Sequence, residues 1–328
     1  MEKRVSLRAE EEDEGAELGH FLRSRAGLGK KEISRAKFLE NGICVNGERR
    51  KTTAVLKAGD LVEVLLEDGK KTSPQLISSE KGLEILYEDE DVIVLNKPAG
   101  LSVHPPGRAA FSGDTLAGRL AFYLRQKQQD CVIRIFGRLD KDTTGVVLAA
   151  KSRTAAARLE RQREAGILKK TYLAAVRGVP EPEEGEICAP IGPDPQDRRR
   201  MRLRDDGKYA LTRYRVLEIR GAEQKPADRE GKRNSGNGPA APVYALVRLR
   251  LETGRTHQIR VHMASMGCPL LGDPLYGIPA AEGEAALIGR AALHAAELVF
   301  RQPFSGKELR IQARLPKDIA RIFDSVIE

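Results

Sequence analysis

The segment from Val243 to Leu251 places an apolar side chain at every second position. Alternate side chains of an extended chain point to opposite sides, so this pattern predicts a β-strand with one buried face. A second run, Leu211 to Leu217, predicts a strand that pairs with it. Between them, residues Gly221 to Ala241 are rich in Gly, Pro, Lys, Asn and Asp and offer little to bury. We therefore expect two paired strands separated by a flexible insertion.

Further strands and helices alternate in the chain between residues 82 and 166. Short apolar runs bounded by turn residues predict strands at Leu83–Tyr87, Val92–Leu95 and Val146–Ala150. Helical spacing predicts helices at Leu116–Leu124 and Thr154–Gly166, with Gly166 as a C-cap. This mixture predicts an α+β domain.

The N-terminal part has a different organisation. Apolar residues recur at helical spacing from Glu17 to Asn41, broken by Gly27 and Gly29, which predicts two short helices. Asn46-Gly47 after a short apolar strand predicts a type I′ hairpin. We expect a separate domain over residues 1–68, a polar linker over residues 69–81 and a larger domain over residues 82–328.

The composition narrows the class of partner. The 328 residues include 56 Lys and Arg against 47 Asp and Glu, and the net charge of +9 favours a polyanionic partner such as nucleic acid. The four scattered cysteines predict neither a zinc knuckle nor a disulfide framework, and they fit a cytoplasmic protein. No apolar stretch approaches the ~20 residues of a membrane span. No phosphate-binding glycine loop occurs either, so no nucleotide cofactor is expected.

Three segments concentrate the residues that carry chemistry. The first is Gly137–Gly145, which ends in a predicted Thr-Gly turn and presents Asp140 between two basic residues just before a buried strand. The second is Lys169–Val176, whose alternation places Tyr172 on the face of Ala174 and Val176. The third is Glu252–Met263, with two arginines, two histidines and a glutamine in eight positions. Asp140 and Tyr172 also have purely structural interpretations. The aspartate could cap a helix or form an ion pair, and the tyrosine could occupy a core position.

Metal binding is a poor explanation for His257 and His262. Their i, i+5 spacing does not put them on one helical face, and the glutamate of a zinc-protease helix is missing. We therefore expect no metal and no cofactor. A fourth notable segment, Gly272–Gly277, is predicted to be a structural turn.

The N-terminal unit resembles an S4 domain, a small RNA-binding module, from Phe21 to Val64. The resemblance implies contacts with structured RNA from the second helix and the hairpin. The positions concerned are Lys31, Arg35 and Lys37. An amphipathic helix with a merely solvated charged face would show a similar pattern.

The larger domain resembles the pseudouridine synthases, in particular the RluA-like branch of large-subunit rRNA and tRNA enzymes that carry an N-terminal S4 domain. Five blocks match in order: Tyr87–Asp91 through Asn96–Gly100 and Val103–Pro105, Arg138–Asp140 through Thr144–Gly145, Lys170–Tyr172, Thr253–His262 and Leu271–Gly277. The branch usually has histidine before Arg-Leu-Asp, whereas this chain has Gly137, as in a sister branch that acts on ribosomal RNA. The implied fold is α+β with a mixed, mainly antiparallel sheet.

The resemblance implies roles for individual residues. Asp140 would be the essential carboxylate, acting as a nucleophile or as a base at the ribose, and the residues alone do not separate these routes. Arg260 would pair with Asp140, and Tyr172 would stack on the uracil and assist loss of the C5 proton. Arg138 would fill the space left by the flipped nucleotide, although it could equally contact phosphate. RNA contacts are also expected from Arg255 and His257.

The expected function is isomerisation of uridine to pseudouridine in structured RNA, with large-subunit ribosomal RNA first and tRNA second as partners. A monomer is expected, since no separate association element is evident. The basic run Arg198–Arg204, followed by Asp205-Asp206-Gly207, could extend the RNA track as a hairpin arm or form an exposed turn. The alternatives are a non-catalytic RNA-binding assembly factor and a glycosylase that releases free uracil.

Overall fold

The computed structural model describes residues 2–67, 79–105, 114–129, 133–221, 242–278 and 288–323. The predicted linker therefore lies outside the described residues except for its last three positions, and so does the predicted insertion except for Gly221. Within the described ranges, no helix is long and apolar enough to cross a membrane.

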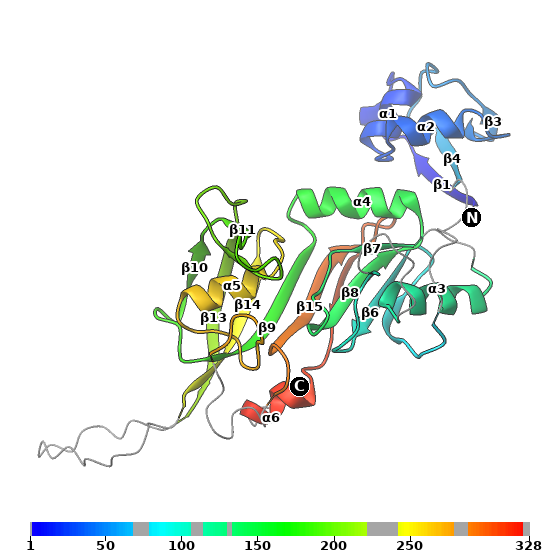
Figure 1. Cartoon of the computed structure of the whole chain (residues 1–328). Coiled ribbons are helices and arrows are strands. Elements are labelled where there is room, and N and C mark those ends of the chain that lie inside the picture. Colours follow the sequence, from blue (N-terminus) through cyan, green and yellow to red (C-terminus); the bar gives the residue numbers. More distant parts are fainter. Residues whose placement is uncertain are drawn as a thin grey trace, which may run out of the picture.

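The N-terminal part is a small sheet packed against two helices (Figure 1). Its elements are β1 (Glu2–Arg8), the short 3-10 helix η1 (Glu11–Asp13), α1 (Leu18–Ser24), α2 (Lys30–Ala36), β2 (Ile43–Val45), β3 (Glu48–Arg49) and β4 (Leu61–Glu67). The strand order is β1-β4-β2-β3, and all neighbours are antiparallel. Asn46 and Gly47 both have positive φ, of 53° and 82°, as the predicted type I′ turn requires.

Strand β1 was not predicted from the sequence. Three basic residues and a serine interrupt its apolar alternation, and only Val5 and Leu7 supply apolar side chains. The strand forms because it completes an edge beside β4, with Val5 opposite Val64. Edge strands tolerate such charged side chains because one side of the strand faces solvent.

The larger part is built on one mixed sheet with the order β10-β13-β14-β9-β15-β8-β6-β5, to which β16 adds beside β15 and β7 beside β8. The strands are β5 (Glu84–Glu88), β6 (Val92–Lys97), β7 (Arg134–Phe136), β8 (Thr144–Ala150), β9 (Lys169–Arg177), β10 (Glu184–Cys188), β13 (Leu211–Arg220), β14 (Tyr244–Leu251), β15 (Leu293–Arg301) and β16 (Glu308–Gln312). Among the strands in the described ranges, only β8 and β15 are parallel neighbours. The predicted α+β class and mainly antiparallel sheet are confirmed, as is the pairing of β13 with β14.

Helices cover both faces of this sheet (Figure 1). They are α3 (Leu116–Gln126), α4 (Arg153–Glu164), α5 (Gln258–Ser265) and α6 (Lys317–Phe323). The first three contribute to the main core with one face of β9, which includes Tyr172. The opposite face of β9, with Leu173 and Ala175, packs against α6.

The predicted Thr-Gly turn after Asp140 is instead the beginning of β8. Gly145 has a φ of 109°, and a Cβ built on it would lie 2.1 Å from the carbonyl oxygen of Ala295. Glycine therefore allows β8 and β15 to approach closely at their single parallel contact. This contact places the start of β8, and the loop before it, over the middle of the sheet.

Helix α4 connects the two parts of the molecule. Arg158 and Arg161 donate hydrogen bonds to the carbonyl oxygens of Ala26 and Gly27, in the loop between α1 and α2. The guanidinium of Arg158 also lies 4.3 Å from the ring centre of Phe304, which packs against the N-terminal core. Backbone carbonyls of the α1–α2 loop and the ring of Phe304 are thus points of attachment between the two parts.

Candidate active site

Asp140 lies in the loop between β7 and β8, with one third of its side chain exposed. The backbone N–H of Thr143 donates to the Asp140 carbonyl oxygen at 3.1 Å and closes a tight turn. Because β8 is buried along its whole length, the loop has a rigid support on its C-terminal side. The side chain is therefore accessible on a well-supported loop, as the sequence predicts.

Two buried cations hold the backbone of this loop. Lys97 is fully buried, and its Nζ donates to the carbonyl oxygen of Lys141 at 2.7 Å and to two carbonyls of the turn that follows β6. The Nη1 of Arg290 donates to the carbonyl oxygen of Asp142 at 3.0 Å, while its Nε and Nη2 bind the carboxylate of Asp318. Burial lowers the pKa of Lys97 to about 8, against the attraction of the nearby carboxylates.

Arg260, on α5, joins Asp140 to a second carboxylate. Its Nη1 donates to Oδ2 of Asp140 at 3.2 Å, and its Nε and Nη2 donate to both oxygens of Asp273 at 2.7 Å. The Asp273 side chain is completely buried and also accepts hydrogen bonds from the backbone N–H groups of Leu275 and Tyr276. Burial opposes ionisation of Asp273, but these donors keep its pKa below the usual range. Arg260 is therefore fixed and points at Asp140.

Tyr172 lies on β9, with only 7% of its surface exposed, on the sheet face that carries the main core. Burial raises the pKa of its phenol, and the negative charge of Asp140 raises it further. The hydroxyl therefore stays protonated at neutral pH. Tyr172 therefore lies within the electrostatic influence of Asp140.

His257 and Tyr276 complete the surroundings of Asp140. The Nε2 of His257 lies 3.8 Å from Oδ2 of Asp140, and its Nδ1 lies 2.9 Å from the Tyr276 hydroxyl. The ring of Tyr276 also lies beneath two guanidinium groups, those of Arg260 at 5.1 Å and Arg200 at 5.4 Å. Tyr276 thus packs against both residues that approach the catalytic candidate.

The remaining polar residues of α5 have structural partners. The Gln258 amide donates to the carbonyl of Leu211 and to the Thr212 hydroxyl, which in turn contacts Nδ1 of His262 at 2.9 Å. This chain of hydrogen bonds fastens α5 to β13. Arg255 donates from its Nε to the carbonyl of Tyr209 at 2.8 Å. Among the described residues, no group of three or more His, Cys, Asp and Glu side chains could hold a metal ion.

The local backbone explains why a glycine, Gly137, precedes Arg138-Leu139-Asp140. Gly137 has a φ of 72°, and a Cβ there would lie 3.3 Å from Nζ of Lys170. A histidine at this position would be strained and would crowd the lysine. Burial lowers the pKa of half-buried Lys170 to about 8. Arg138, the next residue, is exposed at the rim of the loop.

The predicted RNA contacts of the N-terminal part lie apart from this group. Lys31, Arg35 and Lys37 are all exposed, on α2 or directly after it. Arg49, in β3, donates from its Nη2 to the carbonyl of Lys37 at 2.7 Å, so the hairpin lies against the end of α2. Arg49 is itself exposed and thus lies beside Lys37 at the end of α2.

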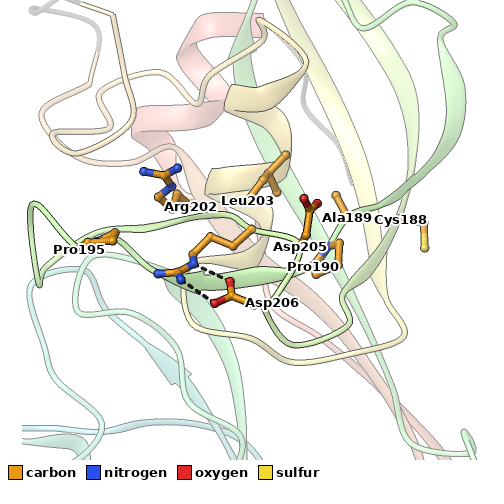
Figure 2. A pocket seen from close by; sticks show the side chains of 9 residues that line it. Cys188, Ala189, Pro190, Pro195, Arg202, Leu203, Asp205 and Asp206 are labelled. Atoms are coloured by element: carbon orange, nitrogen blue, oxygen red, sulfur yellow. Dashed lines mark hydrogen bonds and ion pairs between the residues drawn. The ribbon is translucent and has the colours of Figure 1, made fainter.

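The basic run after residue 197 belongs to a hairpin, formed by β11 (Ile191–Pro193) and β12 (Met201–Leu203). An open pocket of about 720 Å³ lies beside it (Figure 2). The residues that line it are Cys188, Ala189, Pro190, Pro195, Arg202, Leu203, Arg204, Asp205 and Asp206. Arg204 pairs with Asp206 through two hydrogen bonds of 2.7 and 2.6 Å. None of these residues contacts Asp140, so this pocket is separate from the candidate active site.

Sequence reasoning missed four residues of the site: Lys97, Asp273, Tyr276 and Arg290. Asp273 and Tyr276 lie in the segment predicted to be only a structural turn, and Lys97 was noted only within a matching block. One signal could have identified Asp273. A buried arginine that holds a partly exposed carboxylate requires a second anion, and the only candidate carboxylate in the matching block that follows is Asp273.

Comparisons with known proteins agree with this geometry. The family model of RNA pseudouridylate synthase matches residues 91–265. The chain is 35% identical over 280 residues to the uncharacterized RNA pseudouridine synthase YhcT of Bacillus subtilis, covering 85% of this chain and 83% of that protein. It is 37% identical over 314 residues to the ribosomal large subunit pseudouridine synthase D of Xanthomonas campestris, covering 90% and 86%.

Solved structures give the same result. Human RNA Pseudouridylate Synthase Domain Containing 1 superimposes with a TM-score of 0.55 at 25% identity, over 75% of this chain and 89% of that chain. Human RNA Pseudouridylate Synthase Domain Containing 4 gives 0.53 at 26% identity, over 72% and 90%. The sheet, the aspartate loop before β8 and the matching relatives together show that the chain belongs to the RNA pseudouridine synthases and is an enzyme of that family.

Proposed function

We propose that this enzyme isomerises uridines in large-subunit ribosomal RNA, with Asp140 as the essential carboxylate. The observation that carries the proposal is the buried ion pair of Arg260 and Asp273, which aims a fixed guanidinium at the partly exposed Asp140. Relatives named as ribosomal large subunit pseudouridine synthase D support this choice of RNA.

The reaction rearranges two bonds to C1′ of the ribose. The bond from N1 to C1′ breaks, a bond from C5 to C1′ forms, C5 loses a proton and N1 gains one, so the product is an isomer and no cofactor is consumed. Asp140 would act as a nucleophile on the nucleotide or as a base at the ribose. In both routes it must be ionised, and the cation of Arg260 lies 3.2 Å from its Oδ2.

Tyr172 would hold the detached uracil and take part in the transfer of the C5 proton. Its flat, buried ring offers a stacking surface, and its raised pKa keeps the hydroxyl neutral. A neutral phenol would relay the proton: it would accept the proton from C5 while its own passes to N1, the atom that gains one. The exposed Arg138, two residues before Asp140, would occupy the gap in the RNA after the uridine flips out, at a cost of a few kcal/mol for lost stacking.

The N-terminal part would bind RNA as an S4-like domain. Lys31, Arg35 and Lys37 support this role because they are exposed beside the β2–β3 hairpin. Replacing all three by glutamine should weaken RNA binding. The slope of log Kd against log salt concentration should also decrease, by an amount that corresponds to up to about three phosphate contacts, because each such contact releases counterions. The rate at saturating RNA should remain unchanged. A loss of rate with unchanged binding would refute this role.

The decisive test compares cells that lack the gene with cells that express the native protein or Asp140→Asn. Pseudouridine mapping of total RNA should show sites restored by the native protein alone, and they should lie in large-subunit ribosomal RNA. Purified Asp140→Asn should still bind that RNA. Restoration of every site by the variant would refute catalysis by Asp140, and release of free uracil by the native enzyme would indicate a glycosylase.

A further inference from the structure

His257 has a backbone conformation that few side chains adopt. It lies directly before α5 with φ 54° and ψ 21°, in the left-handed region, and its side chain does not cap the helix. Non-glycine residues in this region are uncommon and cost on the order of 1 kcal/mol or more, so they persist where the surrounding structure requires the position. The conformation turns the imidazole towards Asp140 and Tyr276, with 15% of the side chain exposed.

The hydrogen bonds of Tyr276 determine which ring nitrogen of His257 carries the proton. The backbone N–H of Met201 can only donate, and it lies 2.7 Å from the Tyr276 hydroxyl, which therefore accepts there. The hydroxyl must donate its own proton elsewhere. Among the described residues, Nδ1 of His257 at 2.9 Å is the acceptor that it contacts. A neutral imidazole that accepts at Nδ1 carries its proton on Nε2.

That Nε2 is the atom that faces the carboxylate of Asp140. It lies 3.8 Å from Oδ2, the same oxygen to which Arg260 donates at 3.2 Å. The hydrogen bond from Arg260 and the approach of His257 thus both engage Oδ2 of Asp140. We infer that His257, fixed as the Nε2–H tautomer by Tyr276, is a positioning residue that acts with Arg260 on Oδ2 and leaves Oδ1 as the oxygen that reacts with the nucleotide.

The charges around the imidazole agree with a neutral ring. Burial lowers the pKa of His257; the carboxylates of Asp140 and Asp273 raise it and the cation of Arg260 lowers it, and the net change is downward. The ring edge also contacts Tyr276 in a T-shaped arrangement, with centroids 5.6 Å apart. At neutral pH the ring is therefore uncharged, with its Nε2–H facing the carboxylate of Asp140, and does not act as a counterion.

This inference rests on the proposed role of Asp140, and its first test does not depend on activity. The full-length protein would be labelled with ¹⁵N-histidine, and the signals of His257 would be identified by their loss in His257→Asn. We expect a neutral ring with the proton on Nε2 at pH 7.5, and a mixture of tautomers in Tyr276→Phe. A proton on Nδ1, or a doubly protonated ring at that pH, would overturn the inference.

The second test measures single-turnover rates and RNA affinity. His257→Asn is the matched variant because asparagine tolerates a positive φ, so the backbone is kept while the donor is lost. Its rate at saturating RNA should fall roughly tenfold, a modest loss for a polar interaction with a charged group because Nε2 lies 3.8 Å from Oδ2, with Kd for RNA nearly unchanged. Tyr276→Phe should be slower than the native enzyme, and the double variant no slower than His257→Asn alone.

The outcomes separate this inference from the proposed function. Weaker RNA binding by His257→Asn with an unchanged rate would show that His257 is an RNA contact. Additive losses in the double variant would show that Tyr276 acts independently of His257. Either result overturns the inference while catalysis by Asp140 stands. An active Asp140→Asn would instead remove the proposed function, whatever the tautomer of His257.

Discussion

Asp273→Asn should destabilise the enzyme far more than its nearly unchanged shape suggests. The native carboxylate is fully buried and accepts two hydrogen bonds from Arg260 at 2.7 Å and two from backbone N–H groups. The variant removes the charge and turns an amide NH₂ group towards a donor. Breaking a buried ion pair by removing one partner costs about 3–5 kcal/mol. For a domain of this size each kcal/mol lowers Tm by about 2–4 °C, so we expect a fall of roughly 10 °C.

Urea unfolding and thermal melting measure the loss, and the single-turnover rate should fall as well because Arg260 is no longer held towards Asp140. The control is the double variant Arg260→Met with Asp273→Leu. Replacing both charges by apolar groups of similar size is often close to neutral, so this variant should recover most of the stability and remain inactive. The reasoning is refuted if Asp273→Asn unfolds within about 1 kcal/mol of the native enzyme, or if the double variant is the less stable of the two.

Three other changes test the supports of the site. Gly145→Ala should destabilise the protein by more than about 3 kcal/mol, since its Cβ would lie 2.1 Å from the carbonyl oxygen of Ala295 at a φ of 109°; unchanged urea unfolding would contradict this. Burial lowers the pKa of His262 and His294 below the unfolded value of about 6.5. The free energy of unfolding should therefore be constant above that pH and fall as the pH drops below it. Urea denaturation at pH 7.5 and at pH 5.5 measures the difference. Lys97→Met leaves three carbonyl oxygens without their donor. We expect the free energy of unfolding to fall by about 3 kcal/mol and isomerisation to become slower. A fully active and equally stable variant would show that the Asp140 loop keeps its conformation without Lys97.

The sequence was sufficient for those features that depend on local pattern. The helix pair, the hairpin at Asn46-Gly47 and the β13–β14 pairing all follow from periodicity and turn residues, and the structure confirms them. Strand β1 escaped prediction because an edge strand in which charged residues flank only two apolar ones carries a weak signal.

The site shows the same division. The approach of Arg260 to Asp140 was expected from the family resemblance and is present at 3.2 Å. Asp273 and Arg290 were missed because their importance comes from contacts with residues far away in sequence, and no local pattern encodes such contacts. Gly145 was misassigned to a turn because the close approach of β15, which requires a glycine, lies 150 positions further along the chain.

With Asp140 in its proposed catalytic role, the supports of its loop also determine when, during synthesis, the enzyme can become active. Arg260 lies 120 positions after Asp140, Arg290 lies 148 positions after Asp142, and the carboxylate that anchors Arg290 belongs to α6. When the Asp140 loop has just emerged from the ribosome, none of these partners has yet been synthesised. Contacts between residues so far apart in sequence form late in folding. A nascent chain cannot modify the RNA of the ribosome that makes it until α6 has emerged, and truncation before residue 317 should leave a protein that binds RNA without isomerising it.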